Sequence, residues 1–232
     1  MLSVVDAIII LFLLMGVILG FKKGFIKSVV SFVGMILVFV LAFTLKNPLS
    51  VFLYTYLPFF NVGITVINIL IYEAIAFLIL FVIFSSILGI IIKISGIVET
   101  LLKFTIVLGI PSKILGAIFG LLEMYLLIFA TLFLLAQFNV QNSLITDSKI
   151  ADFILGKTPV VSQVFDETYT AVKEVVALNK NYGANQNTDE LNQNGLDILL
   201  KYKVLSVENA NKLLEKNKLK IKDAEQIVSK YR

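Results

Sequence analysis

The chain contains no cysteine, no histidine and no tryptophan among its 232 residues. Without cysteine it forms no disulfide and offers no thiol nucleophile, and without histidine it lacks the commonest metal ligand and general base. A Ser-His-Asp or Cys-His catalytic site is therefore excluded. Because only isolated carboxylates remain for chemistry, we predict a protein that is not an enzyme and that carries no metal or cofactor.

Charged residues are also scarce, at 16% of the chain, whereas 58% of the residues are hydrophobic and the mean hydropathy is +0.93. Soluble domains average about 25% charged residues. After residue 138 the charges almost cancel, with 13 Lys or Arg against 12 Asp or Glu. Since this balance offers no basic surface for nucleic acid, we predict a lipid bilayer as partner and no nucleic acid.

Four long apolar runs occupy the first part of the chain, at about 4–21, 28–45, 62–92 and 114–136. A helix needs about 20 mostly apolar residues to cross the hydrocarbon core of a bilayer. The sequence therefore predicts an all-α, polytopic membrane protein with a four-helix transmembrane domain over 1–138 and a helical soluble tail.

The charges around the first run are the reverse of those in a cleavable signal peptide, because Asp6 precedes the run and three lysines follow it. By the positive-inside rule the N-terminus then lies outside. If this orientation is carried to the later loops, the predicted inner loops hold six lysines and the outer loops three. The inner lysines are Lys22, Lys23, Lys27, Lys93, Lys103 and Lys113, and the outer ones are Lys46, Lys149 and Lys157. This predicts an extracytoplasmic N-terminus and tail, although the first three lysines also suit anionic lipid.

The segments outside the four runs have distinct compositions. Residues 47–61 are rich in aromatic residues and predict a loop at the outer headgroup level, and 95–112 predict an interfacial or re-entrant helix on the cytoplasmic side. In the tail we predict a membrane-proximal helical segment over 139–178, a flexible linker over 179–188 and a small helical subdomain over 189–232.

Three acids lie inside or at the edge of apolar runs: Asp6, Glu73 and Glu123. An ionisable group within a span marks a functional site by default. Asp6 is alternatively a helix cap at the water surface. Glu73 and Glu123, expected one or two helical turns apart in depth, suit either a proton path or protonated acids bonded to neighbouring helices. A Glu123→Gln variant with intact folding and phenotype would remove the proton path.

Small residues mark the faces along which helices approach closely. Gly16 and Gly20 in the first run and Gly116 and Gly120 in the fourth have the spacing of close helix packing. We expect contacts within the chain first, and a homo-oligomer only secondarily.

Two motifs carry a family resemblance. The first is Lys22-Lys23-Gly24-Phe25, a basic-Gly-aromatic turn between the first two helices. The second runs from Lys113 through Gly116 to Gly120 at the start of the fourth. In this order and spacing, residues 1 to about 165 resemble the colicin V production protein family of four-span bacterial membrane proteins. The small helical tail is similar to the C-terminal extension of low-GC Gram-positive members.

The chain departs from the pattern of that family at two places. Many relatives carry Asp where this chain has Ser112, and an Arg-Gly pair where it has Glu123 and Met124. A mechanism that relies on that arginine is therefore not expected here. The resemblance implies a cytoplasmic (inner) membrane protein linked to toxin production and export, biofilm growth and envelope tolerance.

These observations favour a non-enzymatic membrane scaffold whose tail recruits or senses a protein partner in the envelope. The alternative is an oligomeric small transporter or channel component with Glu73 and Glu123 lining its pathway.

Overall fold

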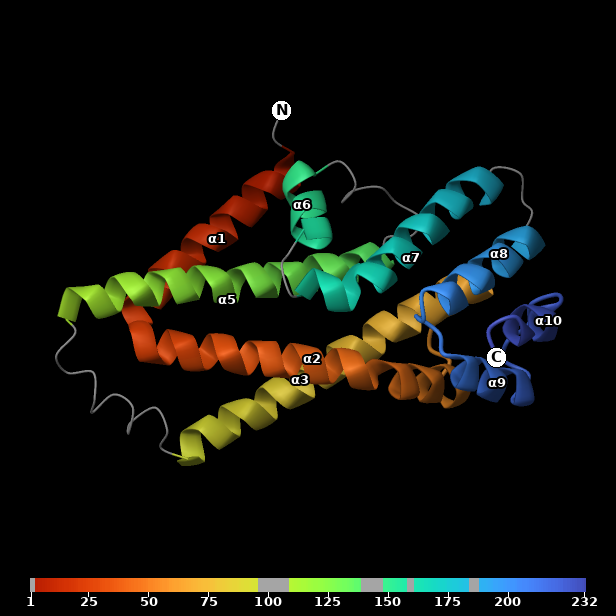
Figure 1. The fold of residues 1–232 in the computed structure, drawn as a ribbon, viewed down its shortest axis with the longest axis horizontal. Coiled ribbons are helices and arrows are strands. Elements are labelled where there is room, and N and C mark those ends of the chain that lie inside the picture. Colours follow the sequence, from red (N-terminus) through yellow and green to blue (C-terminus); the bar gives the residue numbers. More distant parts are fainter. Residues whose placement is uncertain (1–2, 96–108, 139–147, 158–160, 184–187) are drawn as a thin grey trace.

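The computed structural model describes residues 3–95, 109–138, 148–157, 161–183 and 188–232. All regular structure in these ranges is helical, which confirms the all-α prediction (Figure 1). The helices are α1 (Val4–Lys23), α2 (Phe25–Tyr56), α3 (Thr65–Ser95), α5 (Gly109–Phe138), α6 (Lys149–Lys157), α7 (Val161–Gly183), α8 (Thr188–Lys201), α9 (Val207–Glu215) and α10 (Ala224–Ser229).

Four of these helices, α1, α2, α3 and α5, are long and apolar enough to cross a membrane, as the sequence predicted. They contain 20, 32, 31 and 30 residues. Large apolar side chains point outward over most of their length, for example Leu11 (67% exposed) on α1 and Leu37 (56%) on α2. Such apolar surfaces would be unstable in water, so the protein is a multi-pass membrane protein with these four helices in the bilayer.

The second helix is longer than predicted. Residues 47–56, assigned to an outer loop, continue α2 as far as Tyr56, and the connection to α3 begins only at Leu57. Pro48 lies inside the helix, where it removes one backbone hydrogen bond. The turns beyond it persist because they pack on α3, with Leu53 buried and the rings of Tyr54 and Tyr72 5.2 Å apart. Tertiary packing thus overrides the local proline signal.

The first turns of α3 are covered on every side. Residues 66–74 are all buried, and large exposed side chains begin only at Leu78. We call residues 46–56 of α2 and 65–77 of α3 the stem. At ~1.5 Å per residue, the 32 residues of α2 extend about 48 Å, well beyond ~30 Å of hydrocarbon. The α3 part of the stem is therefore covered by protein rather than by lipid, whereas α2 keeps exposed side chains such as Phe52.

The tail packs on this stem instead of forming a separate bundle. Its small helices share one apolar core with α3, in which Val66, Leu70, Leu196 and Leu199 are buried together with residues of α7, α9 and α10. The hydroxyl of Tyr54 donates to the carbonyl of Lys218 at 3.4 Å. In Figure 1, α8 and α9 lie beside the ends of α2 and α3. The marginal size of the predicted subdomain is offset by this docking.

The predicted linker over 179–188 is wrong in its first part. Residues 179–183 form the end of α7, which stops at Gly183, and α8 begins at Thr188. The asparagines there do not break a helix whose preceding turns pack on α8, and glycine is the first strong breaker. Residues 184–187 lie outside the described residues.

The membrane-proximal helices are close to their predicted positions. The segments 143–155 and 159–178 correspond to α6 and α7, although residues 139–147 and 158–160 lie outside the described residues. The two helices are joined by Asp152, which pairs with Lys173 at 2.7 Å and accepts from the Tyr169 hydroxyl at 3.1 Å. Burial raises the pKa of the Tyr169 hydroxyl.

The predicted interfacial segment over 95–112 is described only at its ends. Ser95 closes α3, and 109–112 form the first turn of α5. Residues 96–108 lie outside the described residues.

Candidate functional site

The turn between α1 and α2 is built around one glycine. Gly24 ends α1 and starts α2 with a φ of 76°, which side chains with a Cβ adopt rarely. Its amide donates to the carbonyl of Gly20 at 2.9 Å. Lys22 and Lys23 occupy the last turn of α1, where cations complement the helix dipole.

The four glycines of the predicted packing faces lie against one another where α1 crosses α5. A Cβ on Gly20 would come within 2.2 Å of the carbonyl oxygen of Gly116, and one on Gly120 within 2.4 Å of the carbonyl oxygen of Gly16. No side chain fits between backbones this close. Both predicted packing faces are thus used within one chain.

The two sequence motifs, about 90 residues apart, meet at this crossing. The amide of Phe25 donates to Ser112 Oγ at 3.2 Å, so Ser112 of α5 satisfies an amide in the first turn of α2. The Phe25 and Phe119 rings meet edge to face at 5.6 Å, and Lys113 Nζ lies 5.8 Å from the Phe21 ring. The turn and the start of α5 form one structural unit.

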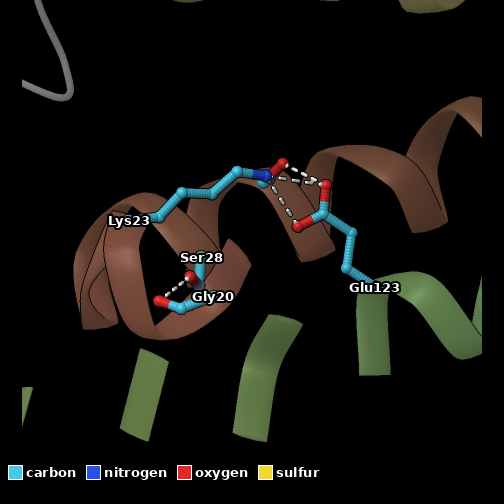
Figure 2. Close-up of polar contacts among 5 residues, drawn as sticks. Gly20, Lys23, Ser28 and Glu123 are labelled. Carbon is cyan, nitrogen blue, oxygen red and sulfur yellow. Dashed lines mark hydrogen bonds and ion pairs between the residues drawn. The ribbon is translucent and has the colours of Figure 1, made fainter. Parts of the chain in front are cut away.

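The predicted acid Glu123 belongs to the same unit (Figure 2). Its carboxylate lies 3.2 Å from Lys23 Nζ and accepts from Ser31 Oγ at 2.7 Å. The Lys23 side chain is 40% exposed and that of Glu123 18%. Figure 2 also shows Ser28, whose hydroxyl donates to the carbonyl of Gly20 at 3.4 Å. Glu123 is therefore the partner of a cation at the bundle end, not an isolated intramembrane acid.

The second predicted acid, Glu73, lies in the stem and is fully buried. Lys46 Nζ is 3.2 Å from its carboxylate, and Ser50 Oγ donates to it at 2.5 Å. The Asn47 amide, oriented with its nitrogen toward Glu73, donates at 2.7 and 3.0 Å. Both side chains of the Lys46–Glu73 pair are at most 2% exposed. Lys46 also lies 4.2 Å from the Phe43 ring, a cation–π contact.

Two predictions about this cluster are wrong. Lys46 is not in an outer loop, because α2 continues past it and buries it against Glu73. Nor are Glu73 and Glu123 one or two turns apart in depth. Their partners Ser31 and Lys46 are 15 residues apart on α2, which at ~1.5 Å per residue is about 22 Å.

The third acid, Asp6, caps two helices at once. It forms a capping box with Ser3 at the start of α1, and its other oxygen accepts from Ser148 Oγ at 2.5 Å and from the Ile150 amide at 3.1 Å. The capping role predicted for Asp6 is present. The residue is only 2% exposed because α6 covers it. Asp6 therefore ties the start of α1 to the start of α6.

A comparison of the chain with known protein families gives a match that includes this site. The sequence model of the colicin V production protein family matches residues 5–159, about two thirds of the chain. The chain belongs to this family. The match covers the four long helices and α6, whereas the helices α7 to α10 lie beyond it. Searches of the curated proteins and of the solved structures returned no match.

Family membership ties this membrane protein to colicin V production.

A layer of phenylalanine rings separates the two acid–lysine pairs of this family member. Phe39 lies between them on α2, 5.3 Å from the ring of Phe77 and 5.7 Å from that of Phe129. Among the described residues no group of three or more Asp, Glu, His or Cys is placed to hold a metal. The arrangement can fix helices and tail, but it does not connect the acids.

Sequence reasoning missed the partners of the acids: Lys46, Asn47 and Ser50 for Glu73, Ser31 for Glu123, and Ser148 for Asp6. One signal was available, since a lysine directly after an apolar run can be inside the helix as well as in the loop. The serines gave none, because small polar residues are common in membrane helices.

Proposed function

We propose that this colicin V production family member is a non-enzymatic membrane scaffold whose tail recruits or senses a protein partner in the envelope. The observation that carries the proposal is the fixed attachment of the tail to the stem. Gly195 of α8 lies so close to α3 that a Cβ there would meet Val66 Cγ1 at 2.7 Å, and Val66 N donates to Asn192 Oδ1 at 3.2 Å. A tail held this way presents one fixed surface to a partner.

The transporter alternative has less support. A proton or ion path needs polar groups that connect across the membrane. Here Glu73 and Glu123 are each paired with a lysine of the same chain. Their partners on α2, Lys46 and Ser31, are about 22 Å apart along that helix. The phenylalanine layer around Phe39 lies between them. Within the described residues of one chain, this layer interrupts a polar route between the two acids.

We further propose that the N-terminus and the tail lie outside a bacterial cytoplasmic membrane. Asp6 and Ser148 are in contact, so the start of α1 and the start of α6 lie at the same end of the bundle (Figure 1). Burial of Lys46 in the stem removes one of the three lysines assigned to the outer side. The remaining excess of lysines at the α1–α2 turn favours a cytoplasmic position for that end of the bundle.

The orientation is tested with single cysteines in this cysteine-free chain. We expect Gln226→Cys, exposed on α10, to react with an impermeant thiol reagent in intact cells. The control Lys22→Cys, exposed at the α1–α2 turn, is expected to react only after lysis. The opposite labelling pattern would place the tail in the cytoplasm.

The scaffold role is tested by detaching the tail while leaving the membrane helices unchanged. We expect Gly195→Leu, which forces α8 away from Val66, to abolish complementation of toxin production in a bacterial host that lacks its own copy of the gene. The control is Gly156→Leu, because a Cβ at Gly156 meets no atom within 4 Å. Ion flux into proteoliposomes that Glu73→Gln or Glu123→Gln abolishes would instead support the transporter.

A further inference from the structure

A polar groove of about 610 Å³ lies between the tail and the α2–α3 connection. One wall is formed by Phe60 and Asn61 of that connection together with Tyr54 of the stem, and the other by the segment that follows α9. The volume is in the range of pockets that hold small ligands or short peptide segments. The groove is separate from the three acid clusters described above.

Three lysines give this groove its charge. Lys216, Lys218 and Lys220 line it, against a single acid, Asp189. The buried Leu219 separates Lys218 from Lys220, so the chain alternates between the core and the groove. Among the described residues these three lysines form no ion pair, whereas other tail lysines are paired, such as Lys212 with Glu208. The groove thus carries an unneutralised positive charge.

Amide side chains form the floor of the groove and are held in place. Asn68, 5% exposed, accepts from the Val62 amide at 2.9 Å and donates to Asn61 at 3.1 Å. Asn192, 8% exposed, accepts from Val66 N at 3.2 Å. Within the described part of the chain the Nδ2 group of Asn192 has no hydrogen-bond partner. Because this Nδ2 group is not fully buried, it keeps access to solvent and can donate to a ligand in the groove.

We propose that this groove binds an acidic peptide segment of the partner, an inference that rests on the proposed scaffold function. The lysines attract its carboxylates, the asparagine amides bond to its backbone, and Tyr54 and Phe60 contact its apolar side chains. A phosphate is disfavoured because Asp189 occupies the first turn of α8, the helix N-terminus that lines the groove.

The test is a binding titration of the full-length protein in nanodiscs of zwitterionic lipid. The probe is a fluorescein-labelled polyglutamate peptide with central phenylalanines, compared with its glutamine counterpart. We expect the acidic peptide to bind in a salt-sensitive way, and the variant K216Q/K218Q/K220Q to bind it about tenfold more weakly or worse. The control K201Q/K203Q/K222Q removes the same charge outside the groove and is expected to bind normally.

Other results would overturn the proposal. Equal weakening by both triple variants would indicate nonspecific attraction to a basic tail. Binding of polyphosphate but not of the peptide would assign the groove to phosphate. If Gly195→Leu abolishes complementation while K216Q/K218Q/K220Q leaves both peptide binding and complementation intact, the scaffold proposal survives and the groove is not its docking site. If neither variant affects complementation, the scaffold proposal itself is wrong.

Discussion

Gly20→Ala is expected to destabilise the membrane domain by about 3 kcal/mol, although it adds only one methyl group. The added Cβ would lie 2.2 Å from the carbonyl oxygen of Gly116 and 2.7 Å from the Cα of Gly120. Both are backbone atoms, so no side chain can rotate away and the two helices must separate. Separation also moves Lys23 away from Glu123. Equilibrium unfolding of the purified protein in mixed micelles measures the loss.

The matched control is Gly89→Ala on α3. Gly89 is also a helical glycine in an apolar run, but a Cβ there would meet no atom within 4 Å. Alanine favours a helix over glycine by up to about 1 kcal/mol, so this variant is expected to be neutral or slightly more stable. Equal unfolding midpoints for both variants would contradict the close approach of α1 and α5.

The architecture of the membrane domain was predictable because it follows from a one-dimensional signal. Twenty or more apolar residues are needed to cross a bilayer, and the four runs can be counted in the sequence. The glycine pairs were predictable as packing faces for a similar reason, since their spacing places both on one side of a helix. The order of the motifs around Gly24 and Gly116 was sufficient to predict the family, which the family comparison confirmed.

The stem was not predictable, because hydropathy does not distinguish lipid from protein as the surroundings of a helix. Residues 65–77 are as apolar as a span, yet the tail and α2 cover them. Pro48 and the aromatic residues after it suggested a loop, and the packing of Leu53 and Tyr54 on α3 keeps that segment helical. For the same reason Lys46 was assigned to water when it is buried against Glu73.

Glu73→Gln is expected to be the most damaging polar substitution, at about 3 to 5 kcal/mol of unfolding free energy. Glutamine has the same shape and keeps a bonding partner for Ser50, but it leaves the ammonium of Lys46 buried without its counter-charge. The cost is mainly that of this unpaired charge. Thermal and denaturant unfolding of the purified protein would measure it. Glu123→Gln at the partly exposed pair with Lys23 is the control and is expected to cost no more than about 1 kcal/mol.

A second substitution separates the pair from the simple loss of a carboxylate. Lys46→Met removes the buried charge with a side chain of similar length, so Lys46→Met combined with Glu73→Gln leaves no unpaired ion. We therefore expect the double variant to be more stable than Glu73→Gln alone, and to recover most of the lost free energy. If the two losses simply add, then Lys46 and Glu73 do not stabilise each other. The packing of α2 on α3 in the stem would then depend on apolar contacts and not on this ion pair.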